Sequence, residues 1–221
     1  VEEGLAAGLS REQMLITGWW TRLGMYEKYD YKESRKKLGF EDDRPVIFIG
    51  GGSLGTSALP KLLPLIMIID KKVGLVINTG TDKLAYKMVE QYKKMFSRFK
   101  KNDNVKIVHL GWIENMAEVL SGCDMVLGKA GPNFLFDTVA CQKPFVAITH
   151  IGGQEDGNIE LIKKKKLGWV KERNKEILDF ILSYLDRPRY FEKKYQENIK
   201  KEADKNKKTL PLILERIKKE I

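Results

Sequence analysis

Residues 110–158 decide the fold of this chain: LGWIENMAEVLSGCDMVLGKAGPNFLFDTVACQKPFVAITHIGGQEDGN. The stretch reads as a strand edge, a helix, a short strand, a second helix, another strand and then a glycine-rich polar turn. Strands that alternate with helices in this way indicate parallel strands joined by crossover helices. Three of the loops therefore follow the carboxyl ends of strands, where open α/β sheets bind ligands.

The same alternation continues through the rest of the chain. Short apolar runs predict buried strands, and the segments between them have the spacing of helices. The fold class predicted is therefore α/β, a Rossmann-like parallel sheet with helices on both faces and a helical basic tail. The expected strands are 14–17, 45–49, 74–78, 105–110, 124–127, 145–149 and 168–170. Helices are expected at 31–38, from just after residue 55 to about residue 72, and at 81–100.

The composition bounds the class of protein. With 221 residues, 43% hydrophobic and 32% charged, the chain can bury the core of a soluble globular protein. It has no run of about 18 apolar residues, so no transmembrane helix is predicted. Cys123 and Cys141 match no metal-ligand spacing, and we expect free thiols in a reducing, cytoplasmic compartment rather than a disulfide. A start at Val1, in mid-pattern, suggests a fragment or a processed form.

Positive charge is concentrated at one end of the chain. Residues 163–221 contain 19 Lys and Arg against 10 Asp and Glu, so nine of the ten net positive charges fall there. Such a basic region suits phosphates or an anionic membrane surface. Nucleic acid is not expected as a partner, because aromatic residues are not interleaved with the basic ones. For Lys163–Lys166, the densest run, a solvated helix end is an equally good interpretation.

A glycine-rich loop, residues 50–55, follows the first strand of the expected core and opens a helix. Gly52 and Gly55 would let the backbone approach a phosphate, Ser53 would add a hydroxyl, and the helix start would contribute amide groups. A tight turn without a ligand is the alternative. A nicotinamide-dependent dehydrogenase is disfavoured, because no acidic residue ends the next strand at 76–79.

The other loops carry polar and aromatic candidates. Trp112 and Ile113 follow the third core strand, where an exposed ring can cover a base, although a core position is favoured for Trp112 taken alone. Gly131 and Pro132 start a helix, and Asp137 lies one to two turns inside it, within reach of a ribose diol or simply at the surface. The glycine-rich turn adds Gln154, Glu155 and Asn158, which suit sugar hydroxyls or a helix cap. Together these groups suit a nucleotide sugar.

At these residues the chain resembles the GT-B glycosyltransferases that include monogalactosyldiacylglycerol synthase, the processive diacylglycerol glucosyltransferases and the lipid II N-acetylglucosaminyltransferase. The resemblance covers the C-terminal, donor-binding half of those enzymes, from about residue 1 to residue 170. It rests on these motifs: Thr17-Gly18 with Arg22, Gly50 to Gly55, Gly111-Trp112-Ile113-Glu114-Asn115-Met116, Lys129-Ala130-Gly131-Pro132, and Gly152 to Asn158.

The resemblance implies a role for each position. Arg22 and Ser53 would meet the diphosphate, Trp112 would lie beside the uracil, and Ile113 would pair with it through backbone groups. Asp137 would hold the ribose where the family usually has Glu, and Gln154 with Glu155 would read the sugar. The sequence also departs from the family at Phe134, where a hydroxyl-bearing residue usually stands.

The resemblance implies a UDP-sugar donor and a lipid acceptor such as diacylglycerol, with no metal, since no Asp-x-Asp motif is present. Residues 1–44 would be an interdomain segment leading into the donor domain, residues 45–173 the nucleotide-sugar-binding core, and residues 174–221 the charged helical tail. The catalytic base would lie in an N-terminal domain, fused or a separate subunit, so no catalytic residue is named and the chain alone is expected to be inactive. Peripheral attachment to an anionic membrane is expected. The alternative is a non-catalytic nucleotide-binding or partner-docking module.

Overall fold

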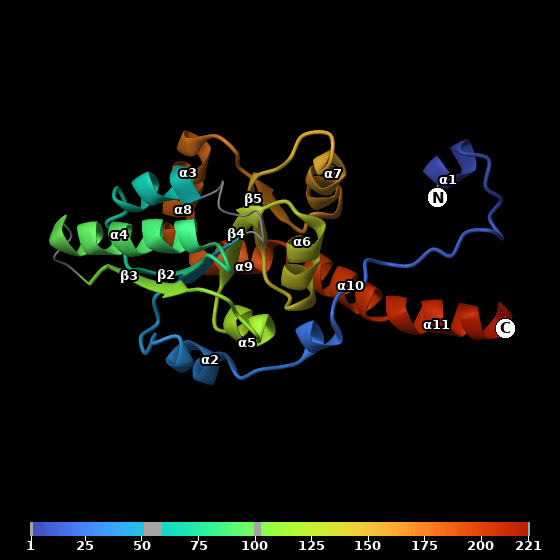
Figure 1. Cartoon of the computed structure of the whole chain (residues 1–221), viewed down its shortest axis with the longest axis horizontal. Helices are drawn as coiled ribbons and strands as arrows, with labels where there is room; N and C mark the ends of the chain where they lie inside the picture. The colour runs from blue at the N-terminus through green and yellow to red at the C-terminus, as the bar shows by residue number, and fades with distance from the viewer. Residues whose placement is uncertain (1, 51–58, 100–102, 221) are drawn as a thin grey trace.

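In the computed structural model, which describes residues 2–50, 59–99 and 103–220, the strands form one parallel sheet (Figure 1). Over those residues the sheet has six strands in the order β3-β2-β1-β4-β5-β6. The order reverses between β1 and β4, and ligands of such sheets bind outside the carboxyl ends of the strands at that point. The strands are β1 (Val46–Gly50), β2 (Val73–Asn78), β3 (Val105–Leu110), β4 (Met125–Lys129), β5 (Phe145–Thr149) and β6 (Gly168–Val170).

The predicted parallel sheet is confirmed, with one strand wrong. Residues 14–17, expected as a short strand, form none. They belong to a segment that runs away from the sheet in Figure 1, and Leu15 and Ile16 are exposed. An apolar run gives a strand only where it meets a neighbour that accepts its backbone hydrogen bonds, and this run meets none among the described strands.

One face of the sheet is covered by helices from both halves of the chain. They bury a cluster of aliphatic and aromatic side chains that includes Leu62, Val89, Ile181 and Tyr184. The first of these helices ends earlier than expected, because residues 67 and 68 form a turn and residues 69–72 lead into β2. The helices are α3 (Leu59–Ile66), α4 (Lys83–Phe99), α8 (Asn174–Asp186) and α9 (Pro188–Lys194).

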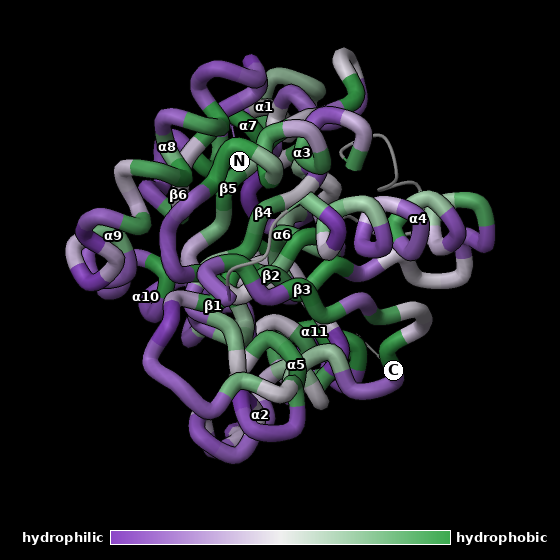
Figure 2. Tube along the Cα trace, turned by 90° about the vertical axis from the view of Figure 1, so that its left-hand side faces the viewer, coloured by the Kyte–Doolittle hydropathy of each residue, from purple (hydrophilic) through white to green (hydrophobic). Residues whose placement is uncertain are grey.

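The opposite face is covered by a second set of helices, as the sequence predicted. Here Phe48 of β1 and Phe145 of β5 pack with Leu135, Ile162 and Ile199 from three helices. Figure 2 shows the central strands mainly hydrophobic and α2 and α9 mainly hydrophilic. This face carries η1 (Leu23–Tyr26), α2 (Tyr31–Lys37), α5 (Met116–Ser121), α6 (Pro132–Ala140), α7 (Asp156–Lys165) and α10 (Gln196–Lys207).

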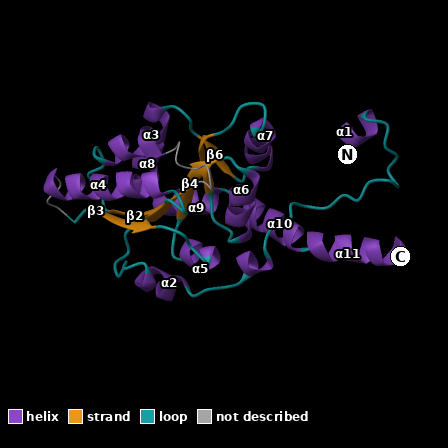
Figure 3. Ribbon diagram, in the orientation of Figure 1, coloured by secondary structure: helices purple, strands orange, loops and turns teal. Residues whose placement is uncertain are grey.

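The two ends of the chain project from the body on the same side. Helices α1 (Glu2–Ala6) and α11 (Thr209–Glu220) both extend from it in Figures 1 and 3, and a long loop joins α1 to η1. The loop is fixed near its end, where the Gly18 amide donates to Thr209 Oγ1 at 2.8 Å and the Trp19 amide donates to Asn206 Oδ1 at 2.9 Å. The segment before η1 is thereby held against the end of α10 and the start of α11.

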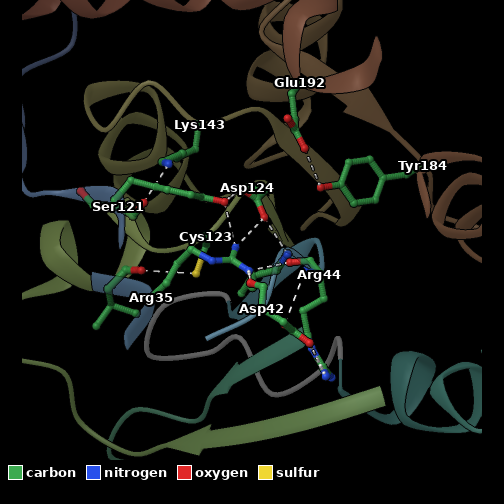
Figure 4. Close-up of polar contacts among 12 residues, drawn as sticks. Arg35, Asp42, Arg44, Ser121, Cys123, Asp124, Lys143, Tyr184 and Glu192 are labelled. Atoms are coloured by element: carbon green, nitrogen blue, oxygen red, sulfur yellow. Dashed lines mark hydrogen bonds and ion pairs between the residues drawn. The ribbon is translucent and has the colours of Figure 1, made fainter. Parts of the chain in front are cut away.

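A polar network closes the amino edge of the sheet (Figure 4). Asp124, just before β4, accepts hydrogen bonds from the Val46 amide at 2.7 Å and from Arg35 Nη1 at 3.2 Å. The buried Arg35 also donates to the carbonyl oxygens of Asp42 and Arg44. These bonds fix the starts of β1 and β4 and leave the carboxyl edge as the open side. No helix in the described part of the chain is long and apolar enough to cross a membrane.

Candidate functional site

The centre of the carboxyl edge is built by close contact of two strands and a helix. Gly50 of β1 pairs with Gly128 of β4. A Cβ atom on Gly128 would lie 2.2 Å from the Gly50 carbonyl oxygen and 2.6 Å from the Phe134 ring. Only glycine lets these backbones approach so closely, so Gly128 allows β1 and the Phe134 ring of α6 to pack against β4.

Helix α6 begins at this edge without a side-chain cap. Gly131 is its N-cap residue and Pro132 its first helical residue. Amide groups of the first turn have no intrahelical acceptor, and the helix dipole adds positive potential there. Phe134 does not face this start, because it is buried and packs on Phe48 and Phe145 at 5.9 Å each. The start of α6 is suited to an anion.

Arg22 forms an ion pair with Asp137 of α6. Arg22 Nη2 lies 3.4 Å from Asp137 Oδ2, and the Thr21 hydroxyl donates to the other oxygen of the same carboxylate. The Asp137 side chain is 14% exposed and that of Arg22 is 65% exposed. Trp19 stacks on Phe136 at 5.0 Å and holds the segment before η1 against the helix. The structure thus brings together two residues that the sequence placed at different parts of a ligand.

Trp112 lies at the surface directly after β3. The residue is 70% exposed, so the core position favoured for Trp112 taken alone is wrong. The loop that carries it is fixed from two sides: Asn78 Nδ2 donates to the Gly111 carbonyl at 2.5 Å, and Ile113 packs partly into the core. An exposed indole on a fixed loop is available to stack on a planar group.

The loop after β5 is held by a buried ion pair. Lys129 Nζ lies 2.6 Å from Glu155 Oε1, and the Ile151 amide donates to Glu155 Oε2 at 2.8 Å. The side chains of Lys129 and Glu155 are 12% and 3% exposed. Both oxygens of Glu155 are therefore used inside the protein, and the pair connects the end of β4 to the start of α7.

Gln154 and Asn158 differ in their surroundings. Gln154 is exposed at the tip of the loop. Asn158 Nδ2 donates to the carbonyl oxygen of Ala130 at 2.8 Å, which fixes the first turn of α7 to the loop before α6. Of the two side chains, Gln154 is the more exposed.

Sequence reasoning missed a histidine at the same edge. His150 Nδ1 lies 2.6 Å from Glu172 Oε1, and Nε2 lies 3.1 Å from Asp156 Oδ1. Its two carboxylate partners raise the pKa of His150, chiefly through the hydrogen bond with Glu172. A polar residue directly after a predicted strand was the available signal, but its partners are distant in sequence or on the next helix.

Three predicted residues, Gly52, Ser53 and Gly55, lie outside the residues that the structure describes. Gly131 begins α6 at the edge, Arg22 and Asp137 pair at the second turn of that helix, and the loops that carry Trp112 and Gln154 follow β3 and β5. Within the described ranges, no group of three or more His, Cys, Asp or Glu side chains is placed to hold a metal ion. Cys123 and Cys141 are free thiols, as predicted.

Two curated relatives cover most of the chain. It is 24% identical over 182 residues to monogalactosyldiacylglycerol synthase 1 of Arabidopsis thaliana, covering 80% of this chain and 33% of that protein. It is also similar to the UDP-N-acetylglucosamine–N-acetylmuramyl-(pentapeptide) pyrophosphoryl-undecaprenol N-acetylglucosamine transferase of Thermoanaerobacter sp. strain X514. The two are 26% identical over 209 residues, which cover 87% of this chain and 53% of that protein. The chain thus spans about a third to a half of the length of these relatives.

A solved structure has the same fold. The Anabaena protein Alr3699/HepE in complex with UDP and glucose matches with a TM-score of 0.67 and 16% identity, over 97% of this chain and 58% of that chain. This confirms the Rossmann-like α/β fold. The family model described as "Glycosyltransferase family 28 C-terminal domain" matches residues 46–216. The chain therefore belongs to glycosyltransferase family 28, through the C-terminal domain of that family.

Proposed function

We propose that this chain binds a UDP-sugar at the carboxyl edge of its sheet and serves as the donor half of an enzyme that transfers a hexose to a lipid. The observation that carries the proposal is the grouping at that edge of an uncapped helix start, a positioned arginine–aspartate pair and an exposed tryptophan. A nucleoside diphosphate needs an anion site, a ribose acceptor and a base platform, and these three features match that need.

The donor would lie along α6 and the loops beside it. The start of α6 and Arg22 would meet the diphosphate, together with Gly52, Ser53 and Gly55 of the glycine loop. Asp137 would accept from the ribose hydroxyls. Trp112 would cover the uracil, and the backbone of Ile113 would pair with its edge.

The sugar would lie near the loop after β5. Gln154 at its exposed tip would read the sugar hydroxyls. For Glu155 to do so, it would have to exchange part of its bonding to Lys129 or the Ile151 amide for a sugar hydroxyl. When UDP leaves, Arg22 and the dipole of α6 would stabilise its charge.

The lipid acceptor is inferred from the relatives. The names of both curated relatives describe transfer to, or synthesis of, a lipid, one with diacylglycerol and one with undecaprenol. Because the chain spans only part of those proteins, the acceptor site and the catalytic base would belong to an N-terminal domain. The isolated chain should then transfer no sugar, and transfer from a UDP-sugar to diacylglycerol by this chain alone would refute that part of the proposal.

Calorimetric titration with UDP, and with NAD as the comparison ligand, tests the donor site. UDP should bind saturably and NAD should not. Trp112→Ala should weaken UDP binding by about 1–3 kcal/mol, the worth of one base stacked on an aromatic ring. Phe99→Ala is the matched control, because Phe99 is 72% exposed, at the end of α4. Absence of saturable UDP binding at millimolar concentration, or equal loss in both variants, would show that the donor site is wrongly placed.

A further inference from the structure

A second pocket lies at the carboxyl end of α6, at the opposite end of the helix from the start that is proposed to meet the diphosphate. Helix α6 runs nine residues from Pro132 to Ala140, a length of about 13 Å at 1.5 Å per residue. Its last residue and the turn after it, together with η1 and α10, enclose a hollow of about 470 Å³. We call it the α6–α10 pocket; its walls include Tyr26, Ser121, Cys141, Lys143, Lys200 and Lys207.

The walls of this pocket carry more positive than negative charge. Four lysines and two acids line it. Both acids have partners already: Asp204 lies 3.7 Å from Lys200 Nζ, and Glu27 accepts a hydrogen bond from the Tyr29 hydroxyl at 2.6 Å. Lys28, Lys143 and Lys207 have no carboxylate within 4.0 Å in the described part of the chain. Among the described residues, the pocket therefore has three lysines without a direct ion-pair partner.

Lys143 is the deepest of these cations. Its ammonium donates to the Ser121 carbonyl at 3.1 Å (Figure 4) and lies 5.7 Å from the centre of the Tyr31 ring. Burial lowers the pKa of Lys143, although several acidic groups around it act in the opposite sense. Lys143 is half-buried, and an ammonium group with one hydrogen-bond acceptor retains two N–H donors for a ligand.

Tyr26 adds a donor without an acceptor. Its hydroxyl is buried and has no hydrogen-bond partner among the described residues. Burial, with the Asp137 and Cys141 charges, raises the pKa of Tyr26 to about 12, so this hydroxyl stays protonated. A buried hydroxyl without a partner costs folding free energy, and an acceptor that enters the pocket would recover it.

The turn that carries Lys143 is held in a conformation that costs free energy. Gln142 has φ = +55°, in the left-handed region, which is unfavourable for residues other than glycine. Gln196 Nε2 donates to the Gln142 carbonyl at 3.4 Å and ties this turn to the start of α10. The strained turn keeps Lys143 beside the pocket.

We propose that the α6–α10 pocket binds the phosphate group of a phosphate monoester, separately from the UDP-sugar site. Such a group carries about −1.5 to −2 charges near pH 7 and offers three strong acceptor oxygens. Those oxygens would accept from Lys143 and Tyr26, with Lys28 and Lys207 at the wall. The volume of the pocket is in the range of small-molecule sites.

Calorimetric titration of the chain with glycerol 3-phosphate, with glycerol as the uncharged comparison, tests the pocket. Glycerol 3-phosphate should bind saturably and glycerol should not. Lys143→Met should weaken binding tenfold or more and Tyr26→Phe several-fold, while Lys164→Met, at an exposed lysine of α7, should leave it unchanged. Tyr26→Phe deletes only an unpartnered hydroxyl, so it decides the test if Lys143→Met does not fold.

Two outcomes would overturn the proposal: no saturable binding at millimolar glycerol 3-phosphate, or binding that Tyr26→Phe and Lys143→Met leave unchanged. The latter would place the phosphate at the donor site instead. Since UDP is absent from this titration, its result does not depend on the donor-site proposal.

The phosphate could be free or belong to a lipid headgroup, and vesicles distinguish the sources. The sedimentation uses the chain with Lys163, Lys164 and Lys166 changed to Gln, so that the basic end of α7 does not contribute, and compares phosphatidylcholine vesicles with vesicles that also contain phosphatidic acid. Sedimentation with the second kind that is lost in Lys143→Met assigns the pocket to a lipid phosphate. Calorimetric binding combined with vesicle binding indifferent to Lys143→Met assigns it to a soluble phosphate ester.

Discussion

The guanidinium of Arg22 lies 3.4 Å from the carboxylate of Asp137, although 115 positions separate them in the chain. Arg22 precedes η1, and Asp137 lies on α6, whose start is suited to an anion. An exposed ion pair adds little to stability by itself. The pair matters for position, because the Asp137 carboxylate restricts the positions that the Arg22 guanidinium can occupy beside the proposed site.

Asp137→Asn should weaken UDP binding about tenfold, which corresponds to about 1.4 kcal/mol. The change removes the charge that orients Arg22 and the stronger acceptor for a ribose hydroxyl, and the amide oxygen can still accept from Thr21. Calorimetry measures the binding, with Asp179→Asn, at an exposed position of α8, as the control. UDP affinity equal to that of the unchanged chain would remove Asp137 from the site.

Glu155→Gln should lower the free energy of unfolding by about 3 kcal/mol, because it leaves the Lys129 ammonium buried without its counter-charge. Urea unfolding measures the loss, and Glu160→Gln on the exposed side of α7 should change stability by less than about 0.5 kcal/mol. Adding Lys129→Met to Glu155→Gln should recover part of the loss. Equal destabilisation by the control and by Glu155→Gln would contradict the pairing.

Much of the sheet could be predicted from the sequence. Strands β3 and β5 have the predicted bounds, since β3 alternates weakly between apolar and polar residues and β5 is an apolar run. The failure at residues 14–17 has a physical origin, because a strand needs a neighbour and local sequence does not tell which neighbour is present. Residues 67–72 show the same limit, since their apolar content suited a longer helix than α3.

The candidate site could be predicted only in part. The loops at the carboxyl edge follow from the strand order, so Trp112 and Gln154 could be placed there. Three ion pairs depend on contacts between elements distant in the chain. They are Arg22–Asp137, Lys129–Glu155 and His150–Glu172. No local pattern indicates them, and His150 was missed for this reason.

The stability of the chain should fall as pH rises through the pKa of His150. That pKa is raised above its ordinary value of 6.5 because Glu172 and Asp156 favour the imidazolium. The stabilisation that His150 contributes to the folded state is therefore fully present below about pH 6.5. It is lost as the pH rises through the pKa that His150 has in the folded state. Urea unfolding between about pH 6 and 9 measures it, and His150→Gln should remove this pH-dependent part. An unchanged pH profile in that variant would show that His150 contributes none of it.

Phe134→Thr, which brings back a hydroxyl at this position, should destabilise the chain by about 3–5 kcal/mol. The ring is buried between Phe48 and Phe145, and deletion of a buried aromatic side chain leaves a cavity. The new hydroxyl would also need a buried partner. Thermal unfolding tests this, with Phe99→Thr as the exposed comparison. A loss no larger than that of Phe99→Thr would mean that the core relaxes around the change.

The basic surface at the end of α7 should attach the chain reversibly to anionic membranes. Lys163, Lys164 and Lys166 are exposed there, while Lys165 pairs with Glu202 of α10. Each lysine near an anionic surface contributes on the order of 1 kcal/mol, screened within about 8–10 Å at physiological salt. The chain should therefore sediment with phosphatidylglycerol vesicles, bind phosphatidylcholine vesicles poorly and be released by salt. Changing Lys163, Lys164 and Lys166 to Gln should abolish most of the binding, whereas the same change at exposed Lys83, Lys87 and Lys94 of α4 should not. If both triple variants bind alike, or if salt has no effect, the lysines of α7 are a solvated helix end.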